Sequence, residues 1–198
     1  DRLGLLIDRE CTHRDNNRLK RRLKAARLPI PATIEDLDLS PSRGLDRRNV
    51  LQLAQGEWLR QHLNILVLGP TGVGKTFLAC ALAHAACRHN FNVRFQRTSR
   101  LLHQTTLAHA DGSYPNLLDA FARIHLLVLD DWLRDPLTRL QSQDLLEILD
   151  DRYDRASTLV ATQVPVAEWH ARLPDPTIGD AILDRLVHNA YRLALKGE

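Results

Sequence analysis

A glycine-rich segment ends in a lysine and a threonine, Gly69-Pro-Thr-Gly-Val-Gly-Lys-Thr76. Its spacing fits the pattern G-x-x-x-x-G-K-[ST], in which convergent backbone N–H groups cradle phosphate oxygens. Lys75 is expected to reach the β- and γ-phosphates of a nucleoside triphosphate, and Thr76 to offer its hydroxyl to Mg²⁺. The residues expected to hold the nucleotide are Gly69, Pro70, Thr71, Gly72, Val73, Gly74, Lys75, Thr76 and Phe77.

The surroundings of this segment favour a nucleotide site over an ordinary Gly-rich turn. The apolar run 63–68 predicts a buried strand before it. Helical spacing of apolar residues from Phe77 to Ala85 predicts a helix after it, whose positive N-terminal end would face the same phosphates. The predicted cofactors are therefore ATP and Mg²⁺.

Two adjacent carboxylates follow a second apolar run, Leu126-Leu-Val-Leu-Asp-Asp131, which is the Walker B arrangement. Asp130 is expected to hold Mg²⁺ through its water shell, and Asp131 to polarise the attacking water as a base. An aspartate is one methylene shorter than the glutamate usual at that position. The water must therefore sit closer, or hydrolysis is slow without help; a protein that holds ATP as a switch and barely turns it over remains an alternative.

Later polar residues extend the predicted site. Thr162 and Gln163 end the run 159–163, where either side chain can sense the γ-phosphate or simply cap the strand. Arg185 lies on a late predicted helix, and we expect it to stabilise transition-state charge on the γ-phosphate of a neighbouring subunit. The alternative for Arg185 is an ion pair with Asp184 or another acid.

Alternating strand and helix patterns predict an α/β fold, with a parallel sheet covered on both faces in three α/β/α layers. Residues 1–45 are expected to form a basic helical arm and a linker, extended over 32–45, and residues 46–198 a nucleotide-hydrolysing core. The predicted helices cover 3–28, 46–60, 75–89, a stretch from about 99, 116–123, 140–155 and 179–189, with a polar loop at 111–115. The predicted strands cover 63–68, 92–96, 124–129, 157–161 and 191–195.

Charge is unevenly distributed along the chain. Residues 1–28 carry a net charge of +5, whereas the whole chain carries +3. A basic arm on a near-neutral core predicts a polyanionic partner, bound through phosphates and without a base-reading motif. The alternative is a charged helix that docks onto a neighbouring subunit. The candidate DNA-binding residues are Arg14, Arg18, Lys20, Arg21, Arg22, Lys24 and Arg27.

Composition excludes several classes. No apolar run approaches the ~20 residues of a membrane span, and the charged N-terminus is unlike a secretory leader, so we expect a cytoplasmic protein without membrane contact. Cys11, Cys80 and Cys87 form no metal or redox motif and are expected to be free thiols. The chain contains no methionine, so we expect it to begin inside a longer protein. The three tryptophans are expected to pack in the interior.

Several segments together resemble one family. They include 68–76, 127–131, Gln163-Val-Pro-Val-Ala-Glu-Trp-His170 and Asp184-Arg-Leu-Val-His-Asn-Ala190, and the likeness extends over nearly the whole chain. These segments are similar to IstB, the AAA+ helper ATPase of a family of bacterial insertion sequences. The last two segments are far more selective than the phosphate loop, which thousands of proteins share.

This resemblance implies a helical arm followed by an AAA+ core related to DnaC and DnaA. It implies ATP binding, homo-oligomeric assembly on double-stranded DNA and delivery of that DNA to a partner transposase. It maps the family roles onto Lys75 and Thr76, Asp130 and Asp131, Thr162 and Gln163, and Arg185. Two departures stand out: Trp132-Leu133 follows the carboxylates where the family often has a Gly, and the stretch ends before an arginine that often follows Gly-Glu.

Two other functions remain open at this level. A DnaC-like helicase loader would share the fold but bind single-stranded DNA and a helicase. A P-loop kinase would need a mobile, arginine-rich lid, and the sequence contains no obvious one.

Overall fold

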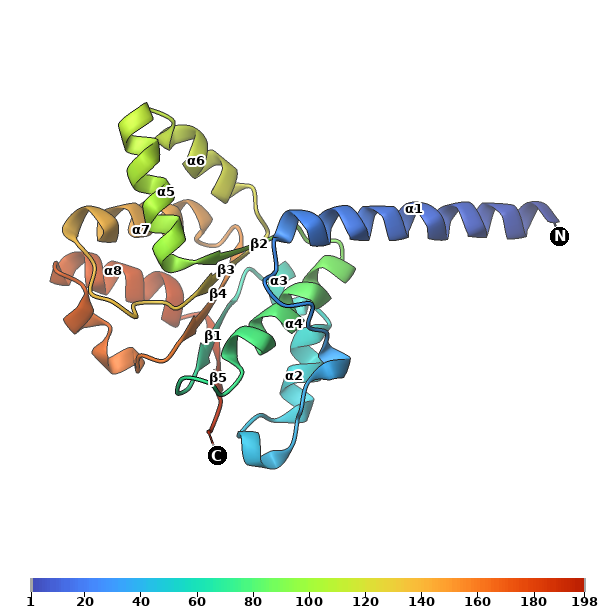
Figure 1. Cartoon of the computed structure of the whole chain (residues 1–198), viewed down its shortest axis with the longest axis horizontal. Helices are drawn as coiled ribbons and strands as arrows, with labels where there is room; N and C mark the ends of the chain where they lie inside the picture. The colour runs from blue at the N-terminus through green and yellow to red at the C-terminus, as the bar shows by residue number, and fades with distance from the viewer. Residues whose placement is uncertain (1, 198) are drawn as a thin grey trace.

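The computed structural model describes residues 2–197, and the side chains of residues 12–40 and 42–197. A five-stranded sheet with the order β2-β3-β4-β1-β5 forms its centre, and every neighbouring pair is parallel (Figure 1). The strands are β1 (Asn64–Leu68), β2 (Val93–Arg97), β3 (Leu126–Asp130), β4 (Ser157–Thr162) and β5 (Ala190–Ala194). The α-helices are α1 (Arg2–Ala26), α2 (Arg47–Ala54), α3 (Glu57–Arg60), α4 (Lys75–Arg88), α5 (Thr98–Asp111), α6 (Tyr114–Ala122), α7 (Arg139–Arg152) and α8 (Pro176–Val187).

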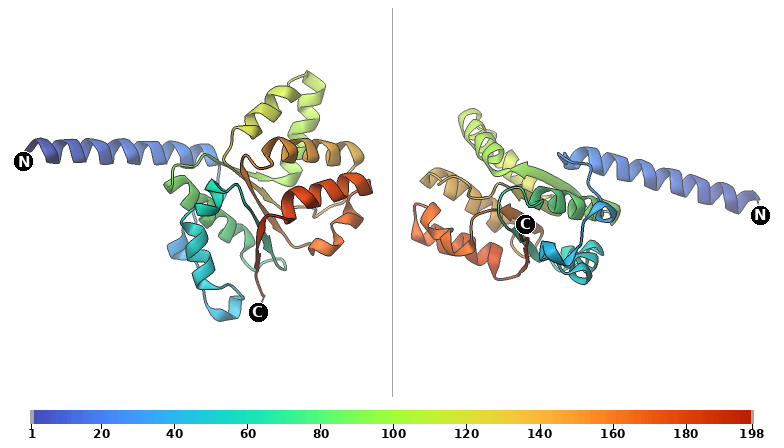
Figure 2. Two further views of the ribbon diagram at one scale, coloured as in Figure 1. Left: turned by 180° about the vertical axis from the view of Figure 1, so that it is seen from behind. Right: turned by 60° about the horizontal axis from the view of Figure 1, so that its bottom comes forward.

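Alternation along the strands builds the predicted three layers. Ile65 and Val67 of β1 belong to the hydrophobic core that α1, α2, α3 and α4 cover. Leu66, between them, points into a second core that α5, α6, α7 and α8 cover. Successive side chains of a strand point to opposite faces, so a buried parallel sheet needs apolar residues at every position. The α/β prediction is confirmed, and Figure 2 shows both helical layers.

The carboxyl ends of four neighbouring strands lie at one edge of the sheet. Leu68 of β1 lies in register with Thr162 of β4, and Asp130 of β3 lies in register with Arg97 of β2. Loops that leave this edge therefore converge, which is where open parallel sheets bind ligands.

The helix expected over 46–60 is wrong as a single element. Gly56 adopts φ 78°, so the chain turns between α2 and α3. The loop expected at 111–115 is shorter, because Tyr114 and Pro115 already form the first turn of α6, where proline needs no N–H partner. Pro176 likewise begins α8 earlier than expected, after the Asp175 side chain caps Thr177 and Ile178.

The linker expected to be extended contains two short 3₁₀ turns, Ile34–Asp36 and Pro41–Arg43. Its apolar side chains pack onto the core rather than standing free. These side chains are Ile30, Ile34, Leu37 and Leu39.

Helix α1 leaves the core as a long projection (Figures 1 and 2). Its C-terminal part packs on the core, where Ala26 is fully buried and Leu19 and Leu23 pack against the first core. Arg94 of β2 donates through Nη1 to the Ala25 carbonyl at 3.2 Å. Leu3, Leu5, Leu6 and Cys11 lie outside the described side chains. Within the described residues, no helix has the length and apolar character to cross a membrane.

Arg152 ties the sheet to the helical layer of α6. It is 1% exposed and donates through Nη1 to the Phe121 and Ile124 carbonyls at 2.6 and 2.7 Å. Its Nη2 donates to the Ser157 carbonyl at 2.5 Å. Burial lowers the pKa of Arg152 to about 9. Carbonyl oxygens from α6 and from the starts of β3 and β4 thus converge on one guanidinium.

Candidate functional site

Close packing against neighbouring residues fixes the shape of the phosphate loop. A Cβ at Gly69 would lie 2.6 Å from the Leu195 carbonyl oxygen, so no other residue fits there without a shift. Gly74 caps the N-terminus of α4 with φ 93°, a conformation that glycine adopts most readily. Val73 is only 7% exposed and anchors the middle of the loop in the first core.

A cavity of about 290 Å³ lies over this loop. Its walls combine the loop with the ends of β3 and β4 and one residue of the linker. The lining residues are Ile30, Thr71, Gly72, Gly74, Lys75, Thr76, Phe77, Asp130, Asp131, Arg134 and Gln163. The structure thus brings most of the predicted nucleotide-binding residues together with both predicted carboxylates.

Lys75 is oriented by the loop itself. Its Nζ donates to the Pro70 carbonyl at 2.7 Å. Burial lowers the pKa of Lys75, and the charges of Asp130 and Asp131 act in the opposite direction. The ammonium group is therefore held over the loop, at the place where a phosphate bound to the backbone N–H groups would meet it.

Asp130 and Thr76 form a pair at the floor of the cavity. The Thr76 hydroxyl donates to Oδ2 of Asp130 at 2.8 Å, and the Asp131 N–H donates to Oδ1 at 3.0 Å. Asp130 is 4% exposed, and burial raises the pKa of its carboxyl group, while the Thr76 hydrogen bond lowers it. A buried carboxylate without a cation is costly, so this site suits a bound positive charge.

Magnesium fits this donor set. A hydroxyl and a carboxylate are hard oxygen ligands, and Mg²⁺ usually takes one or two protein ligands with phosphates and waters. The described residues contain no cluster of three or more His, Cys, Asp or Glu that would hold a metal alone. Thr76 and Asp130 would therefore hold the ion together with the nucleotide.

Asp131 presents its carboxylate differently from its neighbour. Its backbone adopts φ 54°, so the chain reverses immediately after β3. The side chain is 40% exposed and lies 3.5 Å from Nη1 of Arg134. It lines the cavity with Lys75 and Thr76, which is the placement a base needs.

The two sensor candidates are placed differently. Thr162 is 1% exposed; its hydroxyl donates to the Trp132 carbonyl at 2.6 Å and accepts from the Val164 N–H at 3.0 Å. Gln163 lines the cavity and accepts a hydrogen bond from the Thr71 hydroxyl. Only Gln163 therefore faces the nucleotide site, because the Thr162 hydroxyl is used within the chain.

Arg185 lies away from this chain's own cavity. Its Nε donates to Asp150 at 2.8 Å, its Nη1 to Asp184 at 2.7 Å, and the guanidinium lies 4.6 Å from the Tyr153 ring centroid. The Arg185 carbonyl accepts from Asn64, the first residue of β1, whereas the phosphate loop follows the last. The five-residue strand separates them by about 16 Å. The ion pair with Asp184 foreseen from the sequence is thus present.

The predicted DNA-binding residues lie on α1 and just after it. Six of the seven are exposed, and Arg22 is half-buried. Arg18 forms an exposed ion pair with Asp15 at 3.8 Å. The basic side chains therefore form a solvated surface on the projecting helix.

Sequence reasoning missed three contributors. Ile30 joins the cavity from the linker, and Arg134 joins it from the loop after β3. Arg43 donates through Nη1 to the Val73 carbonyl at 3.2 Å and so supports the phosphate loop. The one indication for Ile30 in the sequence was its position as an apolar residue between Pro29 and Pro31. The predicted packing role of Trp58, Trp132 and Trp169 is confirmed, since none is more than 3% exposed.

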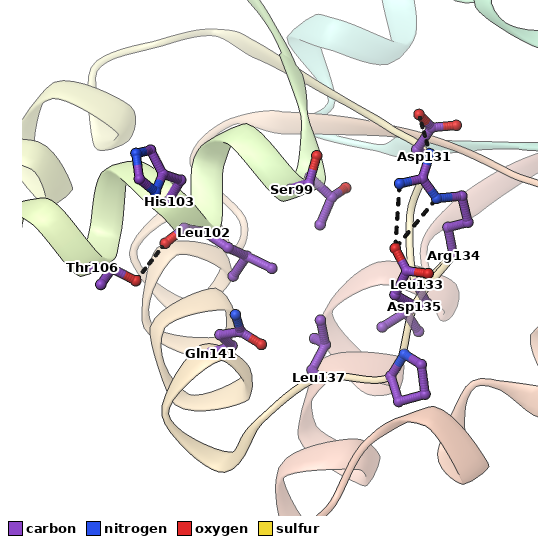
Figure 3. Close-up of a pocket in the computed structure, with 12 residues that line it drawn as sticks. Ser99, Leu102, His103, Thr106, Asp131, Leu133, Arg134, Asp135, Leu137 and Gln141 are labelled. Atoms are coloured by element: carbon purple, nitrogen blue, oxygen red, sulfur yellow. Dashed lines mark hydrogen bonds and ion pairs between the residues drawn. The ribbon is translucent and has the colours of Figure 1, made fainter.

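A second cavity of about 280 Å³ adjoins the first (Figure 3). It lies between the start of α5, the loop after β3 and the first turn of α7, and Asp131 and Arg134 line both cavities. These two side chains therefore form the wall that the cavities share.

Comparison with protein families gives a match over the whole length of the chain. The model of the IstB-like ATP binding protein family matches residues 1–198. A putative insertion sequence ATP-binding protein of Sinorhizobium fredii is 48% identical over 196 residues, which cover 99% of this chain and 80% of that protein. The putative ATP-binding protein of insertion sequence IS1162 of Pseudomonas fluorescens is 48% identical over 166 residues, covering 83% of this chain and 72% of that protein.

Solved structures share the fold at low identity. DnaI has a TM-score of 0.71 at 19% identity, over 83% of this chain and 91% of that chain. AMPPCP-bound DnaA of Aquifex aeolicus has a TM-score of 0.71 at 15% identity, over 85% and 51% of the two chains. The DnaC helicase loader has a TM-score of 0.62 at 20% identity, over 89% and 99%. The fold is thus that of the AAA+ domains of DnaI, DnaC and DnaA.

Proposed function

The chain belongs to the IstB-like ATP-binding protein family, and from this premise we propose that it is a DNA-dependent ATPase that assists the transposase of an insertion sequence. The observation that carries the ATPase proposal is the joint lining of one cavity by Lys75, Thr76, Asp130 and Asp131. These residues supply a cation for the phosphates, two magnesium ligands and an acceptor for a proton of water.

In the proposed reaction the phosphate loop and Lys75 bind the β- and γ-phosphates. Thr76 and Asp130 would hold a magnesium ion, which would supply positive charge against the phosphates. Asp131 orients the attacking water and accepts its proton. Gln163, hydrogen-bonded to Thr71 of the loop, reports on the γ-phosphate.

The proposed ATP site is completed by a second copy of the chain. Arg185 is bound by Asp150 and Asp184 at the other end of β1 and cannot reach its own cavity. A guanidinium from a neighbour would supply the missing transition-state charge. The acidic partners then hold Arg185 until assembly, and hydrolysis is expected to be weak in the monomer.

Duplex DNA is the proposed scaffold for assembly. The exposed basic side chains of α1, on a helix that projects from the core, suit phosphate contacts without base readout (Figure 1). Such binding displaces counterions and falls steeply with salt. The partner transposase is proposed from the relatives, whose names place them in insertion sequences. We propose the cytoplasm as the location, since its DNA and ATP are the proposed ligands.

The proposal is tested by sedimentation velocity and ATPase assays of the full chain. With a non-hydrolysable ATP analogue and duplex DNA we expect a DNA-bound oligomer, and with ATP a DNA-stimulated rate. A Lys75→Ala variant is the control that should lose nucleotide-dependent assembly. A protein that stays monomeric on duplex DNA would refute the assembly, and a preference for single-stranded DNA would favour the helicase-loader alternative.

A further inference from the structure

The loop that follows Asp131 is fixed by buried contacts. Trp132 and Leu133 are at most 1% exposed and pack in the second core. The Trp132 N–H donates to the Ala161 carbonyl at 3.1 Å, and its carbonyl accepts from Thr162. Leu133 adopts φ 51°, a conformation that is rare for a branched side chain. Packing of the two large side chains therefore enforces a sharp turn of the backbone.

Arg172 clamps the next part of the loop. Its Nη1 donates to the Leu133 carbonyl at 3.3 Å and to the Arg134 carbonyl at 2.7 Å. The Leu137 N–H returns a hydrogen bond to the Arg172 carbonyl at 3.0 Å. The backbone of Arg134 is thus held on both sides, and its side chain is directed by the rigid turn.

The Arg134 side chain, in contrast, is loosely held. Its Nε and Nη2 both donate to Oδ2 of Asp135 at 3.3 Å, and its Nη1 lies 3.5 Å from Oδ2 of Asp131, so the contact with Asp131 is a single long one. The side chain is 49% exposed, and Figure 3 shows the guanidinium between the two carboxylates. Half-exposed ion pairs of this length contribute little free energy and exchange easily for a better partner.

The guanidinium also faces the place where the γ-phosphate is expected. Arg134 lines the nucleotide cavity with Lys75, Thr76 and Asp131. A planar guanidinium binds phosphate oxygens bidentately, and a charged phosphate attracts it more strongly than a solvated carboxylate does. Lys75 follows the phosphate loop at the start of α4 and Arg134 belongs to the loop after β3, so the two cations come from different elements.

We infer that Arg134 is a γ-phosphate ligand contributed by the chain that binds the nucleotide, and that it exchanges the Asp131 carboxylate for this phosphate when ATP replaces ADP. The inference rests on the proposed ATP site and adds a cation to it. In the nucleotide-free or ADP state Arg134 covers the Asp131 carboxylate. In the ATP state it releases Asp131 to the attacking water, so recognition of the third phosphate and exposure of the base occur together.

The test compares equilibrium affinities of the full chain for ADP and for a non-hydrolysable ATP analogue, both with Mg²⁺, for the wild type and for Arg134→Ala. We expect the substitution to weaken the affinity for the ATP analogue about tenfold, as for loss of a charged hydrogen bond, and to change the affinity for ADP less than about twofold. Arg134→Lys should retain part of the preference. Arg139→Ala is the matched control, since Arg139 is exposed and pairs only weakly with Asp175 at 3.6 Å.

An unchanged ratio of the two affinities in Arg134→Ala would overturn the inference, and so would an equal loss for both nucleotides. Thermal melting of each variant distinguishes a folding defect from a loss of nucleotide binding. If Arg134→Ala unfolds, the same comparison is made with Arg134→Lys. Failure of the proposed function looks different, because the wild type itself would then bind neither nucleotide or show no DNA-stimulated hydrolysis.

Discussion

The phosphate-loop site and helix α1 are positioned by opposite means. Asp130 is 4% exposed, and each of its carboxylate oxygens accepts a hydrogen bond. Most of the described basic side chains of α1 are exposed, and the last turns of the helix pack on the core. The function of the site therefore depends on the positions of individual atoms, whereas DNA binding by the arm depends on its total charge and its length.

This difference determines how each region should respond to substitution. One change in the site removes an interaction that no neighbour replaces. One change on the arm removes one phosphate contact among several, so only grouped substitutions should have large effects.

The largest effect is expected for Lys75→Ala. Loss of the ammonium group that faces the phosphates should lower the ATPase rate by ~10²–10³, as for other groups that stabilise transition-state charge. Steady-state hydrolysis with duplex DNA measures this, and affinity for DNA without nucleotide should stay within about twofold. Lys24→Ala removes the same charge from the arm and serves as the control. Equal effects of Lys75→Ala and Lys24→Ala on the ATPase rate would contradict the proposed difference between the site and the arm.

Asp130→Asn separates stability from binding. Because burial raises the pKa of Asp130, its ionised form costs free energy in the nucleotide-free fold. We expect the free energy of unfolding of the variant to equal that of the wild type or to exceed it by about 1 kcal/mol, and we expect the variant to lose most of the stabilisation that ATP with Mg²⁺ gives the wild type. Melting scans with and without nucleotide measure both. A variant that melts lower and keeps the nucleotide effect would contradict the assignment.

Much of this site could be predicted from the sequence, because its elements are local. The glycine spacing defines the phosphate loop, and an apolar run followed by two acids defines the end of β3. Arg134 could not be predicted, since its direction depends on the left-handed backbone of Asp131 and Leu133 and on the distant clamp by Arg172. Packing of the 32–45 linker was missed for the same reason, because its partners lie far along the chain.

Grouped substitution should expose the additive behaviour of the arm. Replacing Lys20, Arg21 and Lys24 by Gln is expected to weaken duplex binding about tenfold and to reduce the slope of log affinity against log salt by about 3. ATP affinity without DNA should not change. Fluorescence anisotropy over a salt series measures the slope. Replacing the exposed Arg48, Arg155 and Arg192 is the matched control. An equal loss of duplex affinity in that control would indicate that DNA binds to the core as well as to the arm.

The smallest expected effects distinguish the two residues at the end of β4. Thr162→Val should cost about 1–3 kcal/mol of stability, because the Trp132 carbonyl and the Val164 N–H lose a buried partner. Gln163→Ala should leave stability nearly unchanged and slow hydrolysis several-fold. Denaturant unfolding and ATPase assays of both variants separate the roles. A reversal, with Gln163→Ala unfolding the protein, would place the sensor at Thr162.

The central claim is that the ATP site is shared between copies of this chain on DNA. Subunit mixing tests it most directly, with Asp131→Asn and Arg185→Ala measured alone and as an equal mixture on duplex DNA. Each variant alone should be nearly inactive, and the mixture should recover up to about a quarter of the wild-type rate, because a quarter of the interfaces then combine an intact Asp131 with an intact Arg185. A mixture no more active than the two variants measured separately would contradict a shared site.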